Sequence, residues 1–136
     1  ALTADVITGF PGETEADQAA AVAFLEQVGF AAVHVFPYSR RPGTKADAMP
    51  EQLSHAVKSA RAHEAQRVAD GCKQRYLAQQ VGRILPVLFE TEHDGNWVGH
   101  SDNYCLVRAA GDDLRGLVKN VKISAVSGQM LVGDLV

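Results

Sequence analysis

The residues best suited to bind a ligand lie close to the start of the chain, in the segment Gly9-Phe10-Pro11-Gly12-Glu13. Glycine lets a ligand approach the backbone closely, proline stiffens a turn, and a carboxylate accepts hydrogen bonds. The segment follows the β-branched pair Val6-Ile7, which predicts a strand that ends in a ligand-binding loop with Glu13 at its mouth. The alternative is a tight connection that carries a solvated glutamate.

A second polar loop, residues 37–44, contains Tyr38, Ser39 and Arg41 between two prolines and a glycine. It follows the apolar run 31–36, whose weak alternation is typical of a parallel strand covered on both faces. Both loops follow strand ends, so we expect them at one edge of a sheet, where α/β proteins bind ligands. Alternatively, the loop arginines are solvated charges and Tyr38 serves packing.

A helix over residues 15–28 is expected between these two strands, and it completes a right-handed βαβ unit. Thr14 and Asp17 form a near capping box at its start, and Gly29 suits its end. Apolar residues at three- and four-residue spacing predict a buried stripe. Its members are Ala20, Ala21, Phe24, Leu25 and Val28.

The stretch from about Ser54 to Gln80 predicts a long helix, with Pro50 suited to a first helical position. One face is apolar and the other is net basic, which is usually a solvated face and less often a nucleic-acid contact. The apolar set is Val57, Ala65, Val68, Cys72 and Tyr76, and the basic set is Lys58, Arg61, Arg67, Lys73 and Arg75.

From Val81 onward the pattern becomes strand-like and predicts about five short antiparallel strands, with a hairpin turn at residues 93–96. This suits a small closed β-barrel of OB type, a fold that often binds single-stranded RNA. The alternative is a barrel that packs on a neighbouring domain, with Trp97 in its core or at its rim. The candidate stacking and phosphate contacts are Trp97, Tyr104, Arg108, Lys119 and Lys122, together with Arg83 and Arg115.

Composition limits the partners of this chain. The 136 residues carry a formal net charge of -3, so any contact with RNA must be local. Cys72 and Cys105 lie outside any CxxC pattern, which predicts two buried thiols in a reducing, cytoplasmic compartment. No apolar run approaches the ~20 residues of a membrane span, so no membrane partner is expected. The absence of an initiator Met and the early strand suggest a piece of a longer protein.

Three ordered motifs resemble the radical S-adenosylmethionine methylthiotransferases: Asp5 to Thr14, His34 to Thr44, and Gly95 to Tyr104. The branch that methylthiolates N6-threonylcarbamoyladenosine beside the tRNA anticodon looks most similar. The resemblance implies an α/β part followed by an all-β part. The implied domains are the end of a TIM-like radical SAM barrel (residues 1–49), a connecting helix (50–80) and a five-stranded, OB-like TRAM β-barrel (81–136).

The resemblance also implies roles for the two loops. The strand and loop from Val6 to Glu13 would line the S-adenosylmethionine pocket, and the end of the second strand would contact the nucleoside. The substrate would enter beside the second loop. The implied cofactor-binding residues are Ile7, Gly9, Glu13, Phe36 and Pro37, and the implied substrate-binding residues are Tyr38, Ser39 and Arg41.

Enzymes of this family use S-adenosylmethionine and two [4Fe–4S] clusters. Cys72 and Cys105 are too few to hold either cluster, so the resemblance implies that the ligands lie in the rest of a parent enzyme and that this chain alone is inactive. The implied partner is the tRNA anticodon stem-loop. The alternative function is a stand-alone RNA-binding or docking module. Unpaired sheet edges also predict dimerisation or strand exchange of the isolated chain.

Overall fold

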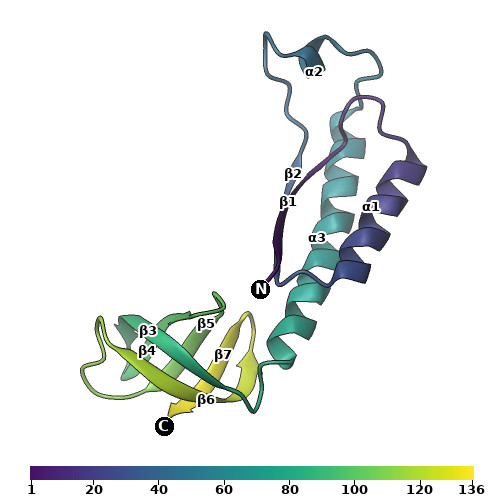
Figure 1. Cartoon of the computed structure of the whole chain (residues 1–136). Coiled ribbons are helices and arrows are strands. Elements are labelled where there is room, and N and C mark those ends of the chain that lie inside the picture. Colours follow the sequence, from purple (N-terminus) through teal and green to yellow (C-terminus); the bar gives the residue numbers. More distant parts are fainter. The chain divides into compact units, whose positions relative to one another are not determined.

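The computed structural model describes residues 1–136 and divides into two compact units, residues 2–73 and residues 74–136 with Ala1 (Figure 1). The division falls within helix α3, which both units share. The elements before the barrel are β1 (Thr3–Thr8), α1 (Glu15–Val28), β2 (Ala32–Pro37), α2 (Lys45–Ala48) and α3 (His55–Ala78). The barrel strands are β3 (Ile84–His93), β4 (Asn96–Ser101), β5 (Leu106–Ala110), β6 (Val118–Ser127) and β7 (Met130–Leu135).

The predicted βαβ unit is confirmed. Strands β1 and β2 pair in parallel, from Thr3 opposite Ala32 to Thr8 opposite Pro37. Helix α1 has the predicted bounds because the Thr14 hydroxyl and the Asp17 carboxylate form a complete capping box, and Gly29 ends the helix at a left-handed φ of 66°. Four buried apolar residues of α1, β2 and α3 form one small core, namely Leu25, Val33, Ala65 and Ala69.

The sheet is covered on one face rather than on both. Helices α1 and α3 pack on one side, whereas Ile7 on β1 and Phe36 on β2, which are opposite each other, are 57% and 53% exposed. The weak alternation of β2 arises because Ala32 and Phe36 are apolar although neither is buried. A run of apolar residues therefore did not reveal that one face lacks a cover.

The inward face of α1 also differs from the predicted stripe. Leu25 is buried and Val28 is half-buried, as expected, but Ala20, Ala21 and Phe24 are exposed. Gln18 and Val22 face inward instead. Alanine is abundant all around this helix, so apolar spacing could not select the buried side, which is set by packing against α3 and by a hydrogen bond of Gln18.

Helix α3 begins later than Pro50 suggests. The Ser54 hydroxyl accepts a hydrogen bond from Val57 N at 3.3 Å, which marks the helix start. Pro50 lies before it, and Glu51 adopts a left-handed φ of 59° that is incompatible with a helix. The predicted apolar stripe is confirmed, since each of its five members is buried or half-buried: Val57, Ala65, Val68, Cys72 and Tyr76.

The second unit is a closed barrel with the strand order β3-β4-β5-β7-β6. All pairs are antiparallel except β5 with β7, which run parallel over a short register. Asp94 and Gly95 form the predicted hairpin turn with φ of 53° and 73°, because both central residues of such a turn need positive φ. Alternate residues point inward and fill the barrel with a core that includes Val87, Phe89, Trp97, Val121 and Leu131.

Candidate functional site

The loops that follow β1 and β2 meet at one edge of the sheet, as the sequence predicts. Tyr38 N donates to Thr8 O at 2.8 Å, which joins the two strand ends. The rings of Phe10 and Tyr38 contact edge to face, with centroids 5.2 Å apart. The loop after β1 is closed by its own glutamate, since Gly9 N donates to Glu13 Oε1 at 2.9 Å. The two loops therefore support each other.

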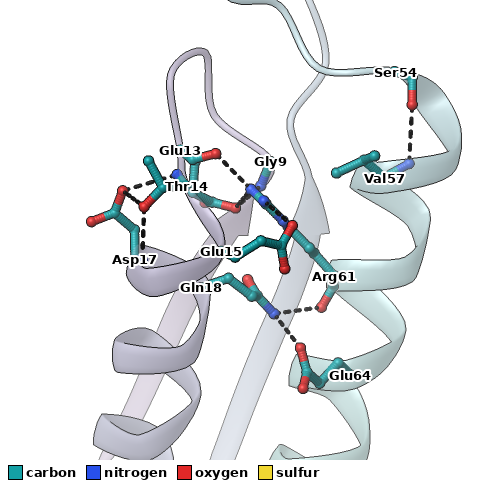
Figure 2. A network of polar contacts seen from close by, with 10 residues as sticks. All are labelled: Gly9, Glu13, Thr14, Glu15, Asp17, Gln18, Ser54, Val57, Arg61 and Glu64. Carbon is teal, nitrogen blue, oxygen red and sulfur yellow. Dashed lines mark hydrogen bonds and ion pairs between the residues drawn. The ribbon is translucent and has the colours of Figure 1, made fainter.

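Arg61 of α3 fixes the loop after β1 from the other side (Figure 2). Its Nη1 donates to Glu13 O at 2.8 Å and to Glu13 Oε1 at 2.7 Å, and its Nη2 donates to Glu15 Oε1 at 2.7 Å. The hydrogen bond with Glu15, reinforced by that with Glu13, raises the pKa of Arg61 although burial acts to lower it. Thus the Glu13 carboxylate is engaged by the protein itself and is not presented at the mouth of the loop.

Sequence reasoning placed Arg61 on the solvated basic face of α3, which is wrong. The Arg61 side chain is only 7% exposed, and it lies on the buried side of the helix. The available signal was its position four residues after Val57 and four before Ala65, inside the apolar stripe. Gln18 adds to this network, because its Nε2 donates to Arg61 O at 3.2 Å and to Glu64 Oε2 at 3.0 Å (Figure 2).

The glycines of the first loop admit protein atoms rather than a free ligand. Gly9 has a left-handed φ of 71°, and a Cβ added to it would overlap Lys58 Cγ and lie 3.1 Å from Lys58 Cα. Gly12 N donates to Glu51 O at 3.1 Å. The close backbone approach expected of a ligand is therefore made by α3 and by the segment before it.

Six of the eight residues predicted to bind cofactor or substrate line one hollow of about 420 Å³, which we call the sheet-edge pocket. Its walls come from the strand ends, the second loop and α2: Ile7, Phe36, Pro37, Tyr38, Ser39, Arg41, Thr44 and Ala46. Gly9 and Glu13, the other two predicted residues, are outside this lining.

The sheet-edge pocket combines an apolar wall with a charged rim. Ile7 and Phe36 are directly opposite each other in the β1–β2 register, on the uncovered face of the sheet. Arg41 lines the pocket and is exposed, and the buried Tyr38 hydroxyl has no hydrogen-bond partner. Such a hollow has the size of small-molecule sites and suits a flat aromatic ligand that carries polar or anionic groups.

The predicted RNA-binding residues of the barrel are not gathered in one place. Tyr104 is 86% exposed, whereas Trp97 is only 7% exposed in the barrel core and offers no free ring face, so its expected stacking role is wrong. Arg108 is opposite Val98 and Val132, Lys122 is opposite Ile84 and Asp134, and Lys119 is opposite Val87. These cations therefore lie in different rows of the barrel.

The barrel has a surface hollow of its own, of about 440 Å³. Tyr104 lines it together with the exposed Leu88 and Val118. Its ionisable groups include the pair His100 Nδ1 to Glu90 Oε2 at 2.6 Å, as well as Asp102. The hollow is thus apolar and partly acidic, and Tyr104 is the only one of the predicted RNA-binding residues in it.

The prediction of two buried thiols is confirmed for Cys72 and Cys105, neither of which forms a disulfide. The Cys72 thiol lies 3.5 Å from Leu25 O. No three His, Cys, Asp or Glu side chains are placed together in a way that could hold a metal ion. No helix combines the length and the apolar character needed to cross a membrane.

Comparison with known proteins gives relatives that are named as tRNA-modifying enzymes, although no family model matches the chain. It is 38% identical over 129 residues to the threonylcarbamoyladenosine tRNA methylthiotransferase MtaB of Bacillus subtilis, covering 90% of this chain and 29% of that protein. It is 39% identical to the tRNA-2-methylthio-N(6)-dimethylallyladenosine synthase of Maricaulis maris, with coverages of 99% and 30%. A synthase of the same name from Nitratidesulfovibrio vulgaris is 36% identical, with coverages of 98% and 32%. The chain therefore spans about a third of the length of these relatives.

Proposed function

Because nearly the whole chain is homologous to one segment of the tRNA methylthiotransferases, we propose that it is the C-terminal part of a radical S-adenosylmethionine enzyme that methylthiolates an N6-modified adenosine of tRNA. In this proposal the parent enzyme carries the activity. This chain contributes one wall of the site for cofactor and substrate, and a barrel that contacts the tRNA.

The sheet-edge pocket is the observation that carries the proposal. It brings Ile7, Phe36 and Pro37, proposed to contact S-adenosylmethionine, beside Tyr38, Ser39 and Arg41, proposed to contact the substrate. An adenosyl group fits these residues, because its flat ring suits the exposed Ile7 and Phe36 and its polar edge can use backbone groups at the strand ends. When bound, S-adenosylmethionine would supply the methyl group and the radical chemistry.

The iron–sulfur clusters of the family do not fit residues of this chain. The chain has the two cysteines Cys72 and Cys105, and both are buried. In this proposal the cluster ligands therefore lie in the rest of the parent enzyme. What the residues here can do is bind, orient and shield, and the Arg61 network, which keeps the first loop in place, serves this role.

The uncovered face of the β1–β2 sheet supports the proposal that other parts of a parent enzyme cover it. Ile7 and Phe36, which are opposite each other in the register, leave part of a parallel sheet open to solvent, whereas parallel sheets are normally covered on both faces. Further strands of a TIM-like radical SAM barrel in the parent enzyme would pair with the sheet edges and surround this face. Its lack of cover in the isolated chain is also the reason to expect dimerisation or strand exchange.

The substrate branch is proposed from the charge of Arg41. A threonylcarbamoyl group ends in a carboxylate, whereas a dimethylallyl group is uncharged. Arg41 lines the sheet-edge pocket and its guanidinium makes no hydrogen bond within the chain, so it is available to pair with a carboxylate. This favours N6-threonylcarbamoyladenosine as the substrate. The dimethylallyl synthases are matched at similar identity, so dimethylallyladenosine is the second candidate.

For the barrel, we propose an RNA-binding role of the TRAM type. Its closed ring of five strands supports the OB-like description. Tyr104 is the proposed stacking residue because its ring is the most exposed aromatic of the chain. Arg108, Lys119 and Lys122 remain proposed phosphate contacts, reached by different parts of an anticodon stem-loop.

The cofactor proposal is tested by titrating the chain with S-adenosylhomocysteine, a stable analogue, followed by amide NMR. We expect shifts at residues of the sheet-edge pocket, and their loss in Phe36→Asp. Phe24→Asp is the matched control, because Phe24 is also more than half exposed but lies on α1, outside the pocket. Equal binding by both variants would contradict the assigned pocket.

The branch is tested with two anticodon stem-loops that differ only in the N6 group, threonylcarbamoyl or dimethylallyl. We expect tighter binding of the threonylcarbamoyl form, and loss of this preference in Arg41→Gln. A preference for the dimethylallyl form would select the second candidate. RNA binding without any response to S-adenosylhomocysteine would instead favour a stand-alone RNA-binding module.

A further inference from the structure

A second hollow of about 500 Å³ lies beside the sheet-edge pocket, and we call it the helix-start pocket. It shares the wall Pro37, Tyr38 and Ser39 with the sheet-edge pocket, and it is completed by Arg40 and by the start of α3. We propose that the helix-start pocket binds a backbone phosphate of the RNA whose modified nucleoside occupies the sheet-edge pocket. The inference rests on the proposed function and names a second contact of the same site.

The charges that line the helix-start pocket favour an anion. Arg40, His55 and Lys58 contribute basic groups, Ser39 and Ser59 contribute hydroxyls, and no carboxylate is among the lining residues. Asp47 outside the lining binds Arg40, with Nε to Oδ1 at 2.7 Å and Nη2 to Asp47 O at 2.9 Å. This orients the Arg40 guanidinium while the Arg40 side chain remains 57% exposed.

The start of α3 adds to this preference. His55, Lys58 and Ser59 belong to the first turns of a helix of 24 residues. Amide groups at a helix N-terminus carry partial positive charge and commonly bind phosphate. A phosphate here would therefore meet side-chain cations and the helix dipole together.

Lys58 is held in place before any ligand binds. Its stem packs against the backbone of Gly9, where a side chain would collide with it. Its Nζ lies 5.7 Å from the centre of the Tyr38 ring, within range of a cation–π contact. A lysine fixed along its length loses less side-chain entropy on binding than a free surface lysine.

Tyr38 connects the two hollows. It lines both of them. A nucleoside and the phosphate attached to it are adjacent along RNA, so occupation of both hollows by one strand agrees with their shared wall. This continuity favours a phosphodiester over a free phosphate ion.

The test compares Lys58→Gln with Arg67→Gln. Glutamine keeps the Cβ and Cγ atoms that pack on Gly9 and removes the charge, so folding is expected to persist. Arg67 is exposed on the same helix and is outside the pocket, which makes it a control of equal charge change. The measurement is the affinity of the chain for a threonylcarbamoyl anticodon stem-loop at several salt concentrations, by fluorescence anisotropy.

For Lys58→Gln we expect affinity to fall about 3- to 10-fold and the salt slope to decrease by about 0.7 to 0.9, the value for one phosphate contact. Arg67→Gln should bind within about twofold of the original chain, as expected of a non-contacting charge. A second variant, Ser59→Asp, places a carboxylate in the helix-start pocket. It should lower the affinity for RNA at least as much as Lys58→Gln does. Unchanged affinity and slope in both pocket variants would overturn the proposal.

Two further measurements separate this inference from the proposed function. Inorganic phosphate is titrated alone by NMR, and shifts at the pocket without any effect of the variants on RNA binding would assign a free-phosphate site, against the RNA proposal. If RNA binding survives in both variants and S-adenosylhomocysteine still shifts the sheet-edge pocket, the phosphate contact is refuted while the proposed function stands. Absence of both RNA and S-adenosylhomocysteine binding would refute both.

Discussion

The barrel and the β1–α1–β2–α3 unit are stabilised in different ways. The barrel core consists of twelve buried residues, and each of its strands pairs with two neighbours, so the ring has no free edge. The other unit has a core of four buried residues and a two-stranded sheet with an open face. The barrel is therefore self-contained, whereas the first unit leaves apolar surface where a site and further strands are proposed.

In the first unit, polar contacts contribute to stability together with the small apolar core. Arg61, Glu13, Gln18 and Glu64 connect α3 to the loop after β1 and to α1. Such contacts depend on direction, and they fix the conformation of a loop better than apolar packing does. The difference between the units suggests that the first unit is organised to hold a loop in place and the second to hold a rigid surface.

The largest expected effect is in the barrel core. Phe89 is fully buried, so Phe89→Ala should cost about 3–5 kcal/mol of unfolding free energy through lost burial and a cavity. Phe24→Ala is the matched control, because Phe24 is 58% exposed and should cost below about 1 kcal/mol. The measurement is amide hydrogen exchange, which follows each unit separately. An equal loss at β1 and β2 amides would show that the two units unfold together, against this comparison.

The next effect tests the polar network. Arg61→Met keeps much of the side-chain stem but removes the guanidinium from Glu13 and Glu15. It should lower the free energy of unfolding by about 2–3 kcal/mol. The value lies below that of a fully buried pair because the Glu15 side chain is 88% exposed. Arg67→Met removes an exposed arginine of the same helix, and it should change stability by less than about 0.5 kcal/mol. Equal stability of the two variants in exchange measurements on β1 and β2 would contradict the proposed role of Arg61.

The two units also differ in how well their sequence predicts them. The five barrel strands and the hairpin turn are predicted from the sequence, because alternation and the Asp94-Gly95 turn report local geometry directly, whereas the parallel pairing of β5 with β7 is not predicted. Helix α1 was found with its bounds because Thr14, Asp17 and Gly29 are specific end signals. These features depend on residues that are neighbours in sequence.

The failures concern contacts between distant residues. Arg61 differs from the exposed Arg67 in its spacing from Val57 and Ala65, but no local signal identifies Glu13 as its partner. Trp97 could be assigned to the core or to the surface until the barrel register was known. The sheet-edge pocket was largely predictable because both of its walls follow strand ends, which parallel pairing brings together. The Lys58 approach to Gly9 was not predictable, since 49 positions separate the two residues along the chain.

A smaller effect separates two glycines of the first unit. Gly9 and Gly29 both have left-handed φ, of 71° and 66°, so alanine should cost about 1 kcal/mol at either position from backbone strain. At Gly9 the added Cβ would also overlap Lys58, whereas nothing lies within 4 Å at Gly29. Gly9→Ala should therefore cost about 1–2 kcal/mol more than Gly29→Ala in denaturant unfolding. Equal losses of unfolding free energy at the two glycines would mean that the contact of Lys58 with Gly9 does not restrict the loop.

The smallest effect is a pH dependence at the start of α1. Hydrogen bonds from the Thr14 hydroxyl and backbone amide hold the pKa of Asp17 below its ordinary value. A carboxyl group with a lowered folded-state pKa stabilises the protein above its unfolded-state pKa, about 3.9 for aspartate, and this contribution is lost as pH falls through the lower folded-state value. Asp17→Ala should thus weaken protection of α1 amides at pH 7, and the difference from the original chain should shrink towards pH 3. Asp5→Ala, which removes an exposed strand carboxylate, should show no such convergence. If the Asp17 difference persisted at low pH, the contribution of Asp17 to the start of α1 would not depend on its charge.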